Sequence, residues 1–79
     1  MKVKTEFEKT IYNEMRHRLH PDVDVYVNYE QGGFAGVTFS YLDVKMQSVF
    51  LESDINQPDY FYYAACKVAE ILGRLALLT

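Results

Sequence analysis

The sequence has little cysteine, little glycine and proline, and no tryptophan. Cys66 is the only cysteine in the 79 residues, so no disulfide can form within the chain. Small secreted domains usually depend on disulfides for stability. The absence therefore favours a reducing, cytoplasmic compartment.

Long hydrophobic runs are also missing. The longest apolar tract is interrupted by Lys67, Glu70 and Arg74, and it falls short of a bilayer span. Residues 1–10 alternate charged with apolar side chains and lack the apolar stretch of a signal peptide. We expect neither a targeting signal nor a membrane-spanning segment.

Motifs for catalysis or cofactor binding are absent too. Gly32, Gly33 and Gly36 lie between two expected strands and no Lys-Ser/Thr pair follows them, so they are turn residues and not a phosphate-binding loop. Cys66 falls within an apolar helical pattern, where a buried, inert thiol is the usual outcome. We expect a protein that is not an enzyme, with no catalytic residue and no cofactor.

A metal site receives weak support. The spacing His-x-x-His-x-Asp-x-Asp, from His17 to Asp24, supplies nitrogen and oxygen ligands. Pro21 redirects the chain between the two halves of this motif, so the imidazoles are not required to converge. A solvent-exposed helix end is the preferred interpretation, and no metal is expected.

The residues that are present describe a globular protein. Hydrophobic residues make up 49% and charged residues 24%, which is too apolar for a disordered tail. A chain of 79 residues has room for one small core, so residues 1–79 are expected to form a single domain.

Two helices are predicted at the ends of the chain. A four-residue repeat forms the apolar stripe of the first: Val3, Phe7, Ile11, Met15 and Leu19. Thr5 and Glu8 fit a capping box at its start, and Pro21 ends it near Leu19. In the second helix Pro58 is expected in the first turn and Asp59 beside the positive end of the helix dipole. Its apolar face is expected to be Phe61, Ala64, Ala65, Val68, Ile71, Leu72, Leu75 and Leu78.

Three strands are predicted between the helices. Residues 22–30 alternate, with Val23, Val25, Val27 and Tyr29 on one face and Asp22, Asp24, Tyr26, Asn28 and Glu30 on the other. A turn at residues 31–33 joins them to a second strand at residues 34–42. The third strand, residues 45–52, alternates imperfectly, which indicates either a bulge or apolar side chains on both faces.

The fold class is therefore α+β, in the order α-β-β-β-α, with an antiparallel three-stranded sheet packed against two helices. This order resembles that of the double-stranded-RNA-binding domain. That family grips phosphates with a lysine cluster at the start of its last helix, where this chain has the acidic and aromatic residues 59–63. The resemblance implies a fold and carries over no functional residue.

Charge is distributed unevenly along the chain. Residues 22–59 contain seven acidic residues and one basic residue, Lys45, whereas the flanking segments are net basic. An acidic surface repels phosphate and attracts basic proteins, so direct nucleic-acid binding is disfavoured. Simple solvation of an exposed face explains the same pattern and stays open as an alternative.

The chain is rich in tyrosine and phenylalanine, with seven and five respectively. Tyrosine is enriched at interfaces, although any single ring is better explained as the edge of a core with its hydroxyl in water, and the cluster is stronger evidence than its members. The expected partner-binding residues combine the acidic and aromatic sets: Asp22, Asp24, Tyr26, Glu30, Asp59, Tyr60, Tyr62 and Tyr63.

Three functions follow as hypotheses. The first is a non-enzymatic inhibitor or adaptor that docks on a basic, nucleic-acid-handling protein, in the manner of a phage-type anti-defence (anti-CRISPR-like) protein in the host cytoplasm. It rests on size, acidity and the lack of motifs. The second is a self-associating subunit, a possible homodimer, whose interface is the small-residue side of the second helix: Cys66, Ala69, Gly73 and Ala76. The third, nucleic-acid binding through Lys9, Arg16 and Arg18, works against the net charge of −3.

Overall fold

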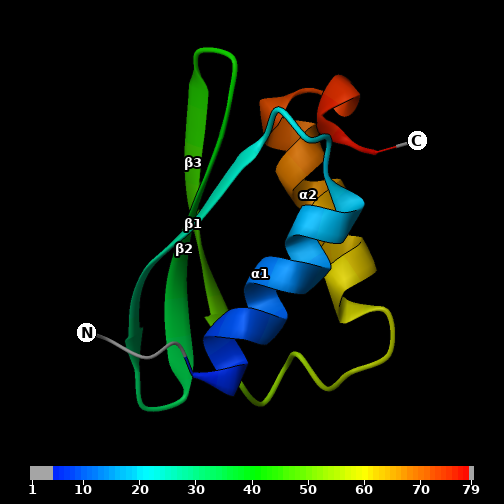
Figure 1. Ribbon diagram of the computed structural model, residues 1–79. Helices are drawn as coiled ribbons and strands as arrows, with labels where there is room; N and C mark the ends of the chain where they lie inside the picture. The colour runs from blue at the N-terminus through cyan, green and yellow to red at the C-terminus, as the bar shows by residue number, and fades with distance from the viewer. Residues whose placement is uncertain (1–4, 79) are drawn as a thin grey trace.

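The computed structural model describes residues 5–78, except for the side chain of Tyr29. Its elements follow the order α1 (Glu6–Arg18), β1 (Asp24–Gln31), β2 (Phe34–Tyr41), β3 (Val44–Leu51), α2 (Tyr60–Leu72) and the short 3₁₀ helix η1 (Arg74–Ala76). The strands form an antiparallel sheet with β2 in the centre, and both helices lie on one side of it (Figure 1). The expected α+β class and element order are confirmed, whereas η1 was not predicted.

Helix α1 begins where its capping residue predicts. The Thr5 hydroxyl accepts a hydrogen bond from the Glu8 N–H at 3.2 Å, which satisfies one of the unpaired donors at the helix start. The predicted stripe faces the core, since Ile11, Met15 and Leu19 are fully buried. Its first member, Val3, lies outside the described residues.

The sheet contains one irregularity, and it is in β1. Val27 pairs with Val37 and Tyr29 pairs with Gly36, so residue 28 is an extra residue opposite β2. Strand β3 instead pairs with β2 without interruption from Val44 to Leu51. The prediction of a bulge in the third strand is wrong. The alternative, a strand with apolar side chains on both faces, is confirmed. Phe50 is buried, while Val49 and Leu51 are exposed on the opposite face.

Helix α2 is shorter than its apolar pattern predicts. It begins at Tyr60, because Asp59 adopts a left-handed conformation with φ 61° and makes no side-chain capping bond. The prediction that Pro58 lies in the first turn is therefore wrong, whereas Asp59 lies at the N-cap, beside the positive end of the helix dipole, as expected. Gly73, at φ 109°, ends the helix, and η1 turns away from its axis. The expected apolar face is consequently incomplete, with three of its members half or more exposed: Ile71, Leu75 and Leu78.

One core joins the two layers. Phe50 of β3 lies at its centre, with ring centroids 6.2 Å from both Phe39 of β2 and Phe61 of α2. The cluster of buried residues draws on α1, the strands and α2 together. No helix among residues 5–78 is long and apolar enough to cross a membrane.

The C-terminal segment returns to the end of α1. Leu77 forms an isolated antiparallel bridge with Leu19, and the Leu78 N–H donates to the Arg18 carbonyl at 3.1 Å. The His20 N–H donates to the Ala76 carbonyl at 2.6 Å. These bonds tie η1 to the junction between α1 and β1.

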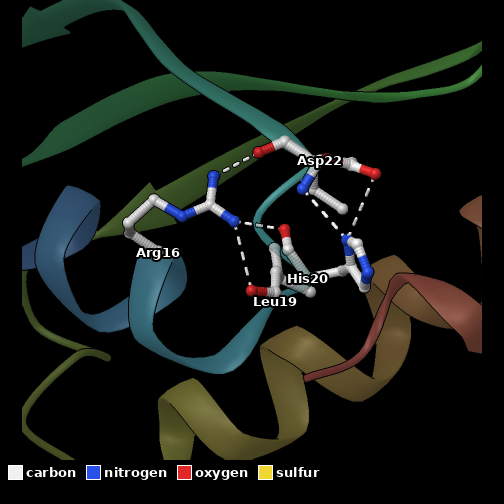
Figure 2. A network of polar contacts seen from close by, with 5 residues as sticks. Arg16, Leu19, His20 and Asp22 are labelled. Atoms are coloured by element: carbon white, nitrogen blue, oxygen red, sulfur yellow. Dashed lines mark hydrogen bonds and ion pairs between the residues drawn. The ribbon is translucent and has the colours of Figure 1, made fainter. Parts of the chain in front are cut away.

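Arg16 holds the same junction from the other side (Figure 2). Its guanidinium donates to the Leu19 carbonyl at 3.1 Å and to the carbonyls of His20 and Val23. His20 in turn accepts the Asp22 N–H on Nδ1 at 3.0 Å. The turn after α1 is thus fixed by side chains that bond to the backbone.

Candidate functional site

Three segments that are distant in sequence meet at one end of the molecule: the start of α1, the β1–β2 turn and the connector 52–59 (Figure 1). An open hollow of about 410 Å³ lies here between α1, the end of β1 and the connector, and its lining includes Glu6, Glu30 and Glu52. We call these three carboxylates the acidic end. Among the described residues, no lysine or arginine lines this hollow.

Glu30 reaches this position because of the bulge in β1. The extra residue shifts the register, so Glu30 pairs with the buried Ala35 and lies on the helix side of the sheet. There its Oε2 accepts a hydrogen bond from the Thr5 hydroxyl. The prediction that Glu30 shares an outer face with Asp24 and Tyr26 is therefore wrong.

Glu52 is positioned by the backbone. Its N–H donates to the Gly33 carbonyl at 2.8 Å, which holds the start of the connector against the β1–β2 turn. Glu52 and Asn56 also line a second hollow of about 460 Å³ with Gly33 and Ser53, so the two hollows adjoin. The backbone of Glu52 is therefore tied to the β1–β2 turn on the sheet side of the acidic end.

Asp54 and Asp59 continue the negative charge along the connector. Asp54 Oδ1 accepts a hydrogen bond from Gln57 Nε2 at 3.4 Å. Burial, and secondly the charge of Asp54, raise the pKa of the Tyr60 hydroxyl. Tyr60 is half-buried, with its ring edge-on to Phe50 at 5.9 Å and to Phe61 at 5.6 Å. It belongs to the edge of the core, although it was expected at a partner-binding surface.

The predicted partner-binding residues do not form one surface. Asp22, Asp24 and Tyr26 lie at the opposite end of β1 from Glu30. Tyr62 and Tyr63 are exposed on α2, and their rings pack edge to face with centroids 5.3 Å apart. The helices and the sheet place these groups on different sides of the molecule (Figure 1).

Tyr62 lines a groove of about 570 Å³ between the helices. His17 and Arg18 of α1 and Cys66 of α2 share this groove, and the C-terminal Leu77 and Leu78 complete its lining. Cys66 is partly exposed here, which corrects the expectation of a buried thiol. Cys66 and His17 both line this groove, and no hydrogen bond joins them in the described part of the chain.

The small-residue stripe proposed for self-association is interrupted. Ala69 and Ala76 are 1% and 0% exposed and belong to the core, while Gly73 is exposed at the end of α2. Cys66 faces the groove. A partner chain cannot reach two of these four residues in this fold.

The residues of the predicted metal motif and of the basic face of α1 are not brought together either. His17 lines the groove, whereas the His20 ring bonds to the backbone of Asp22. Within residues 5–78, no three or more His, Cys, Asp or Glu side chains gather as they would around a metal ion. The basic face of α1 loses two cations to internal contacts, since Arg16 binds carbonyls and Arg18 pairs with Glu14 at 2.5 Å.

Comparison with known proteins found no match among protein-family models, curated proteins or solved structures. The likeness to the double-stranded-RNA-binding domain therefore stays one of element order.

Sequence reasoning included Glu52 in the acidic count but missed Glu6 as its neighbour. Glu6 belongs to the N-terminal segment, which is net basic when counted by sequence. The capping signal at Thr5 and Glu8 could have identified the start of α1 as an acidic site, because carboxylates favour the first turn of a helix.

Proposed function

We propose that this chain is a small protein-binding module, an acidic inhibitor or adaptor, that docks its acidic end on a basic surface of a nucleic-acid-handling protein. One observation carries the proposal. Glu6, Glu30 and Glu52 come from three separate segments and line one hollow without a cation among the described residues that line it.

Carboxylates that line one hollow all add to its negative potential, so a lysine or arginine of a partner is attracted to it. Side chains that normally bind phosphate are suited to this surface, so docking would block a nucleic-acid groove. An anti-CRISPR-like inhibitor is the finer form of this proposal. Binding by such a surface depends on electrostatic complementarity and weakens with salt.

The test uses capture from host lysate at low and high salt, with two double variants. Glu6→Lys with Glu52→Lys reverses two exposed charges of the acidic end. Asp43→Lys with Glu70→Lys makes the same change in net charge at exposed positions elsewhere and serves as the matched control. We expect the first pair to reduce capture of a basic protein at least about tenfold, and the control to change it less than about threefold.

Glu30 stays unchanged in this design, because its bond to Thr5 links it to the start of α1. Circular dichroism of both variants confirms that the fold is retained. Equal losses in the two double variants would show that net charge alone acts, and unchanged capture in both would remove the acidic end as the binding surface.

A further inference from the structure

One face of the sheet is open. The row formed by Val25, Phe39 and Met46 points toward the helices, as the complete burial of Phe39 shows. The neighbouring rows point the other way because side chains alternate along a strand. No described segment covers that opposite face (Figure 1).

The open face is mainly uncharged and partly apolar. Tyr26, Val49 and Leu51 expose 65%, 53% and 43% of their surface on its two edge strands. Phe34 of the central strand lies between residues 31 and 51 and is partly buried. Side chains of this kind are typical of surfaces that another protein covers.

The two charged side chains on the described part of this face occupy symmetric positions. Asp24 on β1 and Lys45 on β3 both pair with Ser40 of β2, so they lie in one row at opposite edges of the sheet. Asp24 Oδ2 accepts a hydrogen bond from the Ser40 hydroxyl at 3.5 Å, and Lys45 is exposed.

We propose that this face binds a second copy of the chain, with the two-fold axis running along β2. Such an axis exchanges the two edges of the sheet, so Asp24 lies over the partner's Lys45 and Lys45 over the partner's Asp24. Strand β2 then packs on the partner's β2, with Phe34 beside its own symmetry mate. Sheets that pack face to face keep their strands within about 30° of each other, and the long lysine side chain spans the resulting offset.

The charge pattern identifies the occupant. A two-fold interface uses the same patch on both chains. An acid on one side of the axis and a base on the other therefore form two ion pairs, one from each chain's acid to the other chain's base. A uniformly basic partner would meet Lys45, and a uniformly acidic one or a nucleic acid would meet Asp24. A second copy satisfies both charges, because it carries the same acid and base at the same spacing.

The size of the face sets the strength of the dimer. Strands of eight residues at about 3.3 Å per residue, and three strands about 4.8 Å apart, give a plane of roughly 26 by 14 Å. Two such planes total roughly 700 Å², which is below the range of about 1,200–2,000 Å² for stable complexes. The dimer is therefore weak and reversible.

Sedimentation velocity from about 5 µM to about 500 µM brackets a micromolar dissociation constant and tests this directly. Asp24→Lys and Lys45→Asp each place like charges over each other, and each should weaken dimerisation at least about tenfold. The double variant exchanges the charges and should restore association to within about threefold of the original. Lys67→Asp makes the same charge change as Lys45→Asp on the exposed side of α2 and should have no effect.

A chain that remains monomeric throughout this range overturns the proposal, and so does a double variant as weak as its single parents. The result is independent of the acidic end, because Glu6→Lys with Glu52→Lys leaves the open face intact and should dimerise normally. Loss of partner capture without loss of the dimer, or the reverse, therefore tells which of the two proposals has failed.

Discussion

Arg16 shows how a single side chain fixes a junction of the fold. Its fork of N–H donors contacts three carbonyls, of Leu19, His20 and Val23, at the end of α1 and in the turn that follows. A lysine ammonium is a point charge on a flexible stem and cannot reproduce this planar fork. Arg16 therefore contributes mainly to the structure, although its charge suggested a phosphate contact.

Arg16→Lys should lower the free energy of unfolding by about 1–3 kcal/mol, because partly buried carbonyls lose their donors. Urea denaturation measures the change. Arg74→Lys, at an exposed position of η1, is the control and should stay within about 0.5 kcal/mol of the original. Similar values for the two variants would contradict the structural role of Arg16.

The raised pKa of Tyr60 predicts that the folded protein loses stability in alkaline solution. Burial, followed by the charge of Asp54, raises its pKa, so the folded protein keeps the phenolic proton at a pH where the unfolded chain has lost it. This contribution is complete below the unfolded pKa of about 10 and disappears as the pH rises through the higher folded pKa. Tyr60→Phe should therefore flatten the decline in unfolding free energy between about pH 9 and 11, measured by urea titration. Tyr26→Phe removes the same hydroxyl from an exposed ring and is the matched control.

At this scale, the sequence predicts local contacts well. Thr5 caps α1 as expected, since the cap needs only neighbouring residues. The contacts of Arg16 depend on the path of the turn after the helix, and periodicity carries no information about that path. The same limit applies to Cys66, whose exposure is set by a groove between two helices.

At the scale of elements, Gly73 determines where α2 ends. Its φ of 109° and ψ of 142° lie in a region that is essentially restricted to glycine. The helical pattern in the sequence continues to Leu78, so periodicity alone extends the helix too far. The turn at Gly73 instead sends η1 back toward Leu19.

Gly73→Ala should cost about 1–3 kcal/mol of unfolding free energy. No atom lies within 4 Å of the added methyl group, so the cost comes from the backbone conformation alone. Gly32→Ala is the matched control, because its site is equally open and its φ is not in the left-handed region. Thermal or urea unfolding that gave equal effects for both would exclude backbone strain as the cause.

The bulge in β1 could not be predicted from the alternation of apolar and polar residues. Alternation through residues 22–30 is regular in the sequence, yet the chain inserts an extra residue at position 28. Asn28 Nδ2 donates to the Thr38 hydroxyl at 2.5 Å, a contact between strands that the order of residues within β1 cannot reveal. The irregular pattern in β3, in contrast, reflects its open outer face.

At the scale of the whole molecule, the sequence predicts the composition of the surface better than its arrangement. Counted along the sequence, the acidic residues between 22 and 59 form one group, but antiparallel strands carry them to opposite ends of the sheet. Glu30 and Glu52 therefore join Glu6 at one end, far along β1 from Asp24. Both element order and fold class could be predicted because they depend on periodicity and turns.

The two proposals are geometrically compatible. An axis along β2 keeps the strand direction of both copies, so a dimer would present its two acidic ends on the same side. Two linked sites bind a two-fold partner with a raised effective concentration. Dimerisation through the open face would thus strengthen docking without any new contact.

The bridge between Leu19 and Leu77 also bears on how the chain acquires its fold during synthesis. The hairpins of β1, β2 and β3 join segments close in sequence and can pair soon after they leave the ribosome. The junction after α1 must wait until residues 76–78 emerge, because its backbone bonds need them. The junction between the C-terminal segment and the end of α1 is therefore the last part of the described fold that synthesis allows to form.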